Sequence, residues 1–570
     1  MAEESELGEE ELKLLEASYR FVADAGTYDQ FIDGWMERLE RIDQRGAGRL
    51  DDFLINRHLG SLSAMMKKIA LDDSDPKDPI EDVVSSVAGA ALILSPSNLV
   101  VALNDLAFDK WNVRRGASTS MNWLDPTSLE NLEQVRRSAM QRGNHLHSIV
   151  RTISDDGRID LAEAFVVDED VNPGLVAIRA LDFGWTEHLS ALLMESFDLT
   201  EAETEVCRLL LDVRGTDEIA DIRSTSVHTI RTQLRTIFAK TQTANQVDLI
   251  RLLGLVSSHL ARRDNLESGK WQDPLGYQKI FQDSYGRNIA YSWMGDPEGR
   301  PALLSHGMAT GYLLHPDGVA LLHERRIKLY CISRPSFGDS DPSPRKDASL
   351  GAADAIVALA QHLNIEEWVV VGLAVGAIPL FLASQNPASG IKGIVGSSSY
   401  IPFTPEESFD HFSPARRVAN RFARTSPMLT ELAVMVTYRM MRIKGPEHIW
   451  QTMYSACEAD KKAASDPDCV ALIRTAAALL TAQKHKALTN DMRMISAYWY
   501  DDFMKCEIPV QFLHGTADAA IPVEKLTSMI EDKPNMQLEM IAGAGELLYY
   551  YHSDKLVTAL ADMTDEVIGE

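Results

Sequence analysis

The chain has 570 residues, of which 45% are hydrophobic and 24% charged, and its formal net charge at pH 7 is −27. This length is too great for one hydrophobic core and predicts about three or four domains. The acidic balance excludes a chain that is basic throughout, so any nucleic-acid contact has to come from a local patch. The five cysteines lack the spacing of a metal site or a disulfide framework, and no apolar run approaches the roughly 18 residues of a membrane span. We therefore expect a cytoplasmic protein with no membrane partner, no metal and no cofactor.

Residues 1–79 are expected to form an α-helical N-terminal region. Apolar residues such as Phe31, Trp35 and Leu39 recur at helical spacing, and nothing in the segment indicates chemistry. We interpret it as a packing or dimerisation element. It ends in an acidic, proline-broken linker at 72–79.

From Gly89 the pattern changes to short strands. Two apolar runs flank the turn Ser95-Pro96-Ser97-Asn98, and Asn104 follows the second run. This opening resembles that of a PAS sensor domain, in which an Asn or Asp after the second strand caps the next short helix. The resemblance implies an α+β PAS-like domain over 80–190 whose default role is dimerisation. Further strands are predicted at His147–Ile153, Ala162–Val167 and Gly174–Ala180.

The next segment predicts three consecutive helices. They are Glu201–Asp212, Thr216–Asp221 and Val227–Lys240, and Thr200 and Ser226 stand where capping residues are preferred. The motifs Leu199-Thr200-Glu201-Ala202-Glu203, Glu218-Ile219-Ala220 and Ser226-Val227-His228-Thr229-Ile230 resemble the LuxR-type helix-turn-helix. The resemblance implies an all-α DNA-binding domain over 191–260.

The third of these helices is basic in an acidic chain. Between Ile222 and Lys240 there are four Lys or Arg residues and no Asp or Glu. Arg231 and Arg235 are four residues apart, so they share a helix face that can enter a major groove. Because each helix-turn-helix reads one half-site, a homodimer on double-stranded DNA is expected. The residues predicted to contact DNA are Ser226, His228, Thr229, Arg231, Thr232, Arg235 and Lys240.

The stretch Gly372-Leu373-Ala374-Val375-Gly376 is the most informative of the chain. It follows the apolar run Trp368–Val371 and precedes the helix-like segment Ala377–Ala383. This strand–turn–helix pattern resembles the G-x-S-x-G nucleophile elbow of the α/β-hydrolase family, and the resemblance covers 268–570. It implies a mostly parallel sheet with a helical cap at about 400–505.

The resemblance also implies where a catalytic triad would stand, and two of its three positions are altered. Ala374 occupies the nucleophile position, Asp518 the acid position, and Glu546 the position of the general base. A methyl group cannot attack a carbonyl, and a carboxylate beside Asp518 is a poor base because the two acids repel each other. The sequence therefore predicts that the protein is not an enzyme.

A pocket remains where the substrate of such a hydrolase would lie. Backbone N–H groups of Val375 and Met308 are expected to form an oxyanion hole, and the cap is rich in methionine and aromatic residues that suit an apolar ligand. A cap that simply fills its own core remains an alternative. The residues predicted to contact a small, mostly apolar carbonyl compound are His306, Gly307, Met308, Ala374, Val375, Trp450, Tyr454, Trp499 and Glu546.

These features together predict a ligand-responsive bacterial transcription regulator. Its sensor would be the degenerate hydrolase domain, and its output the helix-turn-helix. Two alternatives stay open. One is an α/β-hydrolase-type enzyme with an unorthodox catalytic group. The other is a regulator whose hydrolase shell only dimerises, while the PAS-like domain senses.

Overall fold

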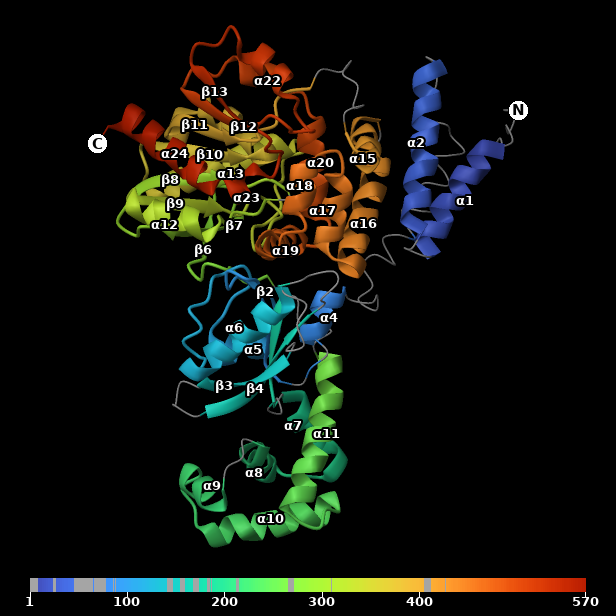
Figure 1. Cartoon of the computed structure of the whole chain (residues 1–570), viewed down its shortest axis with the longest axis vertical. Coiled ribbons are helices and arrows are strands. Elements are labelled where there is room, and N and C mark those ends of the chain that lie inside the picture. Colours follow the sequence, from blue (N-terminus) through green and yellow to red (C-terminus); the bar gives the residue numbers. More distant parts are fainter. Residues whose placement is uncertain are drawn as a thin grey trace. The chain divides into compact units, whose positions relative to one another are not determined.

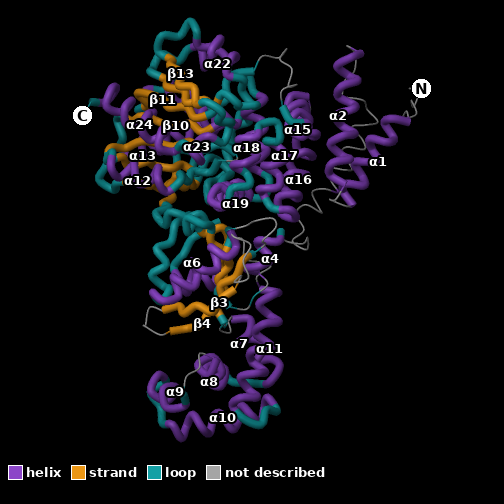
Figure 2. The backbone as a smooth tube through the Cα atoms, viewed as in Figure 1, coloured by secondary structure: helices purple, strands orange, loops and turns teal. Residues whose placement is uncertain are grey.

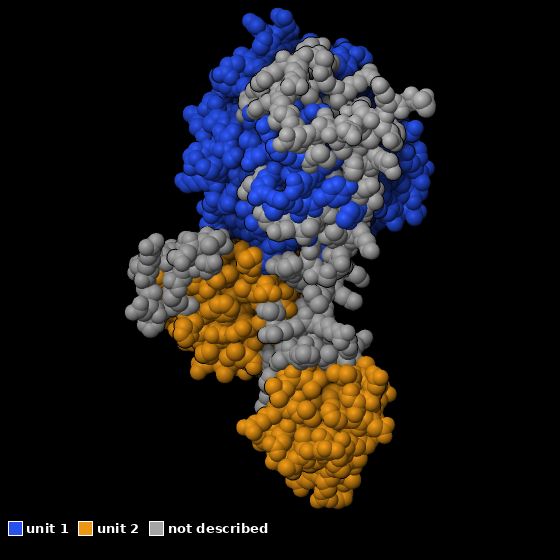
Figure 3. Space-filling view, turned by 90° about the vertical axis from the view of Figure 1, so that its right-hand side faces the viewer, with its two compact units in different colours: residues 1–78, 271–570 blue, residues 79–270 orange. Residues whose placement is uncertain are grey.

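The computed structural model describes residues 9–23, 27–45, 65, 78–85, 87, 89–140, 147–153, 159–167, 174–181, 185, 187–211, 215–264, 271–308, 310–403, 412–425 and 427–569. Contacts between α-carbons divide the chain into two compact units, which Figure 3 colours separately. One unit combines residues 1–78 with 271–570, and the other contains residues 79–270. The chain therefore leaves the first unit and returns to it.

The unit of residues 79–270 contains an antiparallel five-stranded sheet, ordered β2-β1-β5-β4-β3. Asn104 follows β2 and caps α5, because its side-chain oxygen accepts the N–H of Ala107 at 3.0 Å. The predicted strands and this cap are confirmed. The elements are α4 (Pro79–Ser85), β1 (Ala91–Leu94), β2 (Val100–Leu103), α5 (Asp105–Trp111), α6 (Pro126–Met140), β3 (His147–Ile153), β4 (Ile159–Val166) and β5 (Val176–Ala180).

Helices continue the same unit after the sheet. Figure 1 shows them in green: α7 (Glu187–Phe197), α8 (Glu201–Leu211), α9 (Thr216–Ile222), α10 (Val227–Thr241) and α11 (Gln246–Asp264). Thr200 and Glu203 exchange hydrogen bonds across the first turn of α8, at 2.8 Å and 3.3 Å. The three predicted helices are confirmed to within a residue or so at each end. Ile230, Leu234 and Ile237 bury one face of α10 in a core shared with α8 and α11.

The other unit is built on an eight-stranded sheet, ordered β13-β12-β11-β10-β8-β9-β7-β6. The strands from β13 to β9 are parallel, and β7 and β6 are antiparallel at one edge. Figure 2 shows the strands in orange among their flanking helices. The mostly parallel sheet that the sequence predicts is confirmed. The strands are β6 (Lys279–Gln282), β7 (Asn288–Gly295), β8 (Arg300–Ser305), β9 (Ile327–Ile332), β10 (Trp368–Leu373), β11 (Ile391–Ser397), β12 (Val510–Gly515) and β13 (Met536–Ile541).

Between β11 and β12 the described residues form helices and loops, in the place predicted for the cap (Figure 1). The cap helices are α15 (Pro414–Thr425), α16 (Pro427–Lys444), α17 (Pro446–Met453), α18 (Glu458–Ala463), α19 (Pro467–Thr481), α20 (Lys486–Ser496) and α21 (Tyr500–Met504). The helices of this unit outside the cap and after β8 are α12 (Pro316–Glu324), α13 (Ala348–Leu363), α14 (Ile378–Ser384), α22 (Val523–Ile530), α23 (Leu548–Tyr551) and α24 (Ser553–Ile568).

The N-terminal helices α1 (Glu9–Ala23) and α2 (Tyr28–Arg45) pack on the cap. Trp35 is 1% exposed, and its ring meets that of Phe422 in α15 edge to face at 4.8 Å. Its indole N–H donates to Ser18 Oγ at 3.3 Å, which joins α2 to α1. The apolar face that the sequence assigns to packing or dimerisation is thus partly used within one chain. The rest of the predicted region 1–79 lies largely outside the described residues.

From the contact of Trp35 with the cap we predict the effect of removing its indole ring. Trp35→Ala is expected to destabilise the packing of α1 and α2 on the cap by about 3–5 kcal/mol, because it leaves a large cavity. Urea unfolding and limited proteolysis of the N-terminal helices measure the effect. Arg20→Ala is the control, since Arg20 is exposed and its pair with Glu16 is worth little. Equal stability and equal cleavage of the two variants would show that the contact is not stabilising.

Candidate functional site

The site begins at the turn that follows β10. Ala374 has a φ of 48°, a left-handed conformation that is uncommon for residues other than glycine. At Gly376 a Cβ would lie 2.3 Å from the carbonyl oxygen of Ser305 and 2.4 Å from that of His306, so a side chain has no room there. The strand therefore turns sharply into the short 3-10 helix Ala374–Ala377 and then α14. The predicted strand–turn–helix is confirmed, with a methyl group at its tip.

The loop after β8 lies against this turn, and its polar groups bond within the loop and to the backbone of Arg334, which follows β9. The side chain of His306 is buried, with Nδ1 2.9 Å from the carbonyl oxygen of Gly307 and Nε2 accepting the N–H of Arg334 at 3.4 Å. Burial, and then the charge of Arg334, lower the pKa of His306 well below its usual range, so the ring is neutral. The N–H of Gly307 donates to Thr310 Oγ1 at 2.6 Å. His306 and Gly307 thus shape the loop.

A buried ion pair joins the cap to the loop that carries the altered base position. Nη1 of Arg416 in α15 donates to Oε2 of Glu546 at 2.6 Å, and both side chains are less than a tenth exposed. Nη2 of Arg416 donates to the hydroxyl of Tyr400, which follows β11. Burial raises the pKa of that hydroxyl above its ordinary value. Arg416 thereby supplies the positive charge that allows Glu546 to be buried as a carboxylate.

Asp518 lies in the same buried region and has one oxygen without a partner. Its Oδ1 accepts the backbone N–H groups of Ala520 at 2.7 Å and Ile521 at 3.0 Å. Its Oδ2 makes no hydrogen bond among the described residues and lies 3.6 Å from Nε2 of His514. That nitrogen instead bonds the carbonyl oxygen of Ile521 at 2.7 Å. Burial, and then the charge of Glu546, raise the pKa of Asp518 well above its usual range, which favours a protonated carboxyl.

A third carboxyl group, Asp460 of α18, completes the cluster. Its two oxygens accept the backbone N–H groups of Glu546 at 2.9 Å and Leu547 at 2.8 Å, so it fixes the loop that carries Glu546. Burial raises its pKa to about 6. Arg416, Tyr400, Asp460 and His514 are not among the site residues that the sequence predicts. Asp518 is predicted from its local sequence, whereas the cap residues become its neighbours only through tertiary packing.

An apolar cavity lies under the cap and borders this cluster through Arg416. Its open volume is about 40 Å³, which holds a few water molecules at most. Flexible methionine side chains form part of its wall, so a larger ligand can be accommodated by rotamer changes there. The lining residues are Met308, Arg416, Ala419, Thr430, Ala433, Val434, Thr437, Ile449, Trp450, Met453, Tyr454, Leu488 and Met492.

The structure places some of the predicted ligand residues at the apolar cavity and others away from it. Met308, Trp450 and Tyr454 line the apolar cavity, and Glu546 is linked to it through Arg416. The predicted contacts His306, Gly307, Ala374 and Val375 do not line it. Trp499 instead packs on Phe381 and Phe503, with ring centroids 5.6 Å and 5.8 Å apart. The cavity therefore lies toward the cap, away from the elbow, because cap helices supply most of its wall.

The predicted DNA-contacting residues mostly lie on one exposed face of α10. His228, Thr229, Arg231, Thr232 and Arg235 are exposed, and Ser226 caps the helix by accepting the N–H of Thr229 at 3.1 Å. Lys240 is the exception. Its ammonium group bonds Glu203 Oε2 at 2.8 Å and the carbonyl oxygen of Asp198 at 2.7 Å, so it ties α10 to α8. In this structure Lys240 is thus engaged within the helical domain, and its predicted contact with DNA stays a prediction.

Comparison with known proteins identifies the fold of the C-terminal part. Residues 302–559 match the model of the alpha/beta hydrolase family, and this part of the chain is an α/β-hydrolase domain. Similar solved structures include an esterase from Thermogutta terrifontis (20% identity, TM-score 0.37, covering 51% of this chain and 98% of that chain). Others are an esterase from a Rhodococcus species (18%, 0.36, 51% and 99%) and the enol-lactonase from Burkholderia xenovorans (14%, 0.38, 50% and 98%).

The prediction that the protein is not an enzyme is contradicted by the family match over residues 302–559. That prediction rested on the missing serine and histidine, but a cluster of ionisable side chains still borders the cavity. In the described parts of the chain no helix has the length and apolar character needed to cross a bilayer. Nor do the described residues contain a group of three or more acidic, histidine or cysteine side chains suited to a metal ion.

The raised pKa of Asp460 predicts a pH dependence of stability. The folded state holds this proton up to about pH 6, whereas the ordinary carboxyl releases it near 3.8, so stability falls as the pH rises through that window. Between about pH 5 and about pH 7.5 the free energy of unfolding of the wild type is expected to fall. In Asp460→Asn this fall is expected to be smaller by about 1–2 kcal/mol. Urea titrations at both pH values measure it, with the exposed Asp532→Asn as control. An unchanged loss in Asp460→Asn would contradict the assignment.

Proposed function

We propose that the C-terminal domain is a hydrolase-type enzyme that acts on a small, mostly apolar carbonyl compound through an unorthodox catalytic group. The observation that carries this proposal is the position of Arg416. Its side chain lines the apolar cavity and also pairs with Glu546, so a substrate in the cavity would meet a charged, water-excluded cluster. The family match over 302–559 supports a hydrolytic reaction.

The chemistry that fits these groups is addition of water to an ester or lactone carbonyl. Glu546 takes a proton from the attacking water, and the guanidinium of Arg416 stabilises the negative charge that develops on the carbonyl oxygen. The bond between the acyl carbon and the alkoxy oxygen then breaks, and the alkoxy oxygen takes the proton held by Asp518. A proton passes from Glu546 back to Asp518 to restore both groups. Ala374 takes no part in this reaction except as a small residue that leaves space at the elbow.

Turnover of p-nitrophenyl acetate, butyrate and octanoate tests the proposal. Glu546→Gln and Asp518→Asn are each expected to lower kcat/KM about 10²-fold, as for the loss of a general acid or base. The control is Glu524→Gln, because Glu524 is exposed at the start of α22. Asp518→Asn is the more informative variant, since it leaves the buried pair of Arg416 intact. Wild-type turnover in both variants, or none in the wild type, would refute the proposed mechanism.

A second function is favoured by the exposed basic face of α10. We propose that residues 191–260 are a LuxR-type helix-turn-helix that binds double-stranded DNA as a homodimer. Ser226, His228, Thr229, Arg231, Thr232 and Arg235 would contact it. The capped helices α8, α9 and α10 and the buried core between them support this proposal.

The five-stranded sheet and the Asn104 cap support a PAS-like domain at 80–190. The whole chain would then be a cytoplasmic regulator that joins a helical region at 1–79 and the hydrolase domain at 268–570 to these parts.

Binding to DNA duplexes selected from a random pool tests this second function. Arg231→Ala and Arg235→Ala are each expected to cost about 1–3 kcal/mol of binding free energy if the side chain reads a base edge. Fluorescence anisotropy at fixed salt measures the dissociation constants. Arg208→Ala is the control, because Arg208 already pairs with Glu205 in α8 at 2.6 Å. A double variant of Arg231 and Arg235 that binds as tightly as the control would exclude this face of α10.

A further inference from the structure

A second cavity borders another face of the cap helix α20. It has an open volume of about 360 Å³, within the range of small-molecule sites. Leu488 and Met492 of α20 line the apolar cavity, whereas Thr489, Asn490 and Arg493 line this one. The helical period of 3.6 residues places these two sets on different faces. The helix α20 therefore forms part of the wall of both cavities, of which one is apolar and the other is polar and charged.

The floor of this second cavity is held rigidly. Both terminal nitrogens of Arg334 pair with the carboxylate of Asp491, at 2.7 Å and 2.8 Å, and the two side chains are at most 2% exposed. The amide of Asn490 donates to Ser336 Oγ at 3.2 Å. These bonds connect α20 to the loop that follows β9. The loop and the helix thus form a preorganised polar site.

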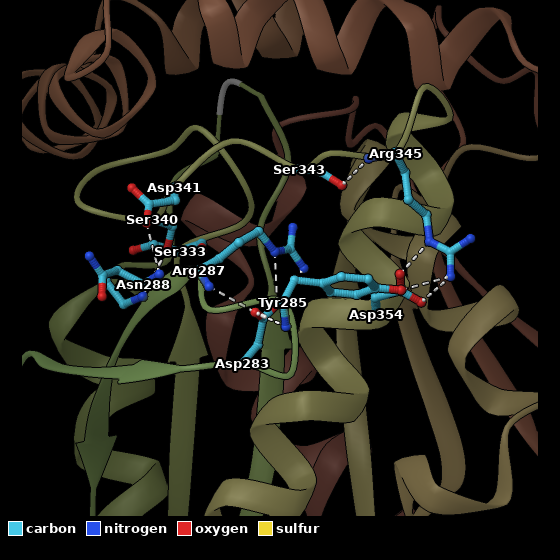
Figure 4. Close-up of polar contacts among 11 residues, drawn as sticks. Asp283, Tyr285, Arg287, Asn288, Ser333, Ser340, Asp341, Ser343, Arg345 and Asp354 are labelled. Carbon is cyan, nitrogen blue, oxygen red and sulfur yellow. Dashed lines mark hydrogen bonds and ion pairs between the residues drawn. The ribbon is translucent and has the colours of Figure 1, made fainter.

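The rim of the cavity carries cations without partners. Lys346, Lys486 and Arg493 line it, all three are exposed, and none has an ion-pair partner among the described residues. Arg345 also lines it but is held by Asp354, as Figure 4 shows. The acidic lining residues are Glu431 and the paired Asp491. In a chain of net charge −27, these unpaired cations form a local positive patch that favours an anionic ligand.

Hydroxyl donors and a helix end add to the positive charge. Ser336 and Ser343 line the cavity, and their hydroxyl groups suit an acceptor-rich ligand, whereas the hydroxyl of Thr489 already donates to the carbonyl oxygen of His485 at 3.0 Å. Lys486 is the first residue of α20, an 11-residue helix whose N-terminal N–H groups favour an anion. A carboxylate has fewer acceptor oxygens and less charge than a phosphate, so it would satisfy less of this rim. The donor set therefore matches a phosphoryl group.

We propose that this cavity binds a small phosphate-bearing molecule, which bridges the loop after β9 and the cap helix α20. The phosphoryl group lies against Lys346, Lys486 and Arg493. Because Leu488 and Met492 project from the same helix into the apolar cavity, the bound anion restrains that wall as well. Ligands of the two cavities are then coupled, and each changes the affinity of the other by the same factor.

Calorimetric titration of the full chain with inorganic phosphate and with pyrophosphate, at constant ionic strength, tests the binding. Pyrophosphate is expected to bind with one-to-one stoichiometry. Lys486→Ala and Arg493→Ala are each expected to weaken it about tenfold, as for the loss of a charge-assisted hydrogen bond. Lys505→Ala is the matched control, since Lys505 is an exposed lysine that does not line the cavity. Absence of binding, equal affinity in the Lys486→Ala/Arg493→Ala variant, or equal affinity for sulfate would overturn the proposal.

Hydrogen exchange of the α20 amides, followed by mass spectrometry, tests the bridge without any assay of turnover. Pyrophosphate is expected to slow exchange within Lys486–Ser496 in the wild type and in Lys505→Ala, and to leave it unchanged in Lys486→Ala/Arg493→Ala. Slower exchange in the double variant would contradict the site. Binding without any change in α20 would contradict the bridge. Neither the calorimetric titration nor the exchange measurement needs a substrate. The results of both are therefore independent of the proposed enzyme activity.

Discussion

The buried guanidinium of Arg416 is the feature on which the site depends. Asp460, Asp518 and Glu546 are all at most 6% exposed, and burial of an uncompensated carboxylate is costly. Arg416 pairs with Glu546 at 2.6 Å, while Asp518 adapts through a raised pKa. The cap therefore contributes more than a cover over the sheet. It supplies the charge that allows the altered base position to exist as a carboxylate.

The same residue explains why the cavity and the charged cluster form one site. Arg416 projects from α15 between the methionine-rich cap and the loop that carries Glu546. The walls of the cavity are mostly apolar, and the guanidinium of the ion pair is among its lining groups. In this low-dielectric setting a charge acts more strongly on a carbonyl group than it does in water. The open volume is small, and Met308, Met453 and Met492 are the flexible side chains of its wall.

The elbow keeps its strained geometry although its tip carries no nucleophile. Ala374 has a positive φ, and Gly376, two residues on, lies so close to the backbone of Ser305 and His306 that a side chain has no room there. The turn also places Ala374 against Gly307, where an ideal Cβ would lie 3.2 Å from the methyl group. The turn is thus closely packed against the backbone that follows β8.

The sequence by itself determined the features that depend on short-range signals. The strand–turn–helix around Gly372–Gly376, the Asn104 and Ser226 caps and the three helices from Glu201 all follow from neighbouring residues. The hydrolase fold is likewise read from local motifs spread along 268–570. These predictions succeed because caps, turns and periodicity involve residues a few positions apart.

Tertiary structure alone decided which side chains meet. Arg416 and Glu546 are 130 positions apart, and Asp460 and Glu546 are 86 apart. Lys240 has the charge of a phosphate contact, yet packing of α10 on α8 commits it to Glu203. Ala374 and Val375 of the elbow were expected to line the ligand pocket. The cavity is lined by Met308, Trp450 and Tyr454 instead. Such pairings depend on how helices from distant segments pack, and a local pattern contains no information about a partner a hundred residues away.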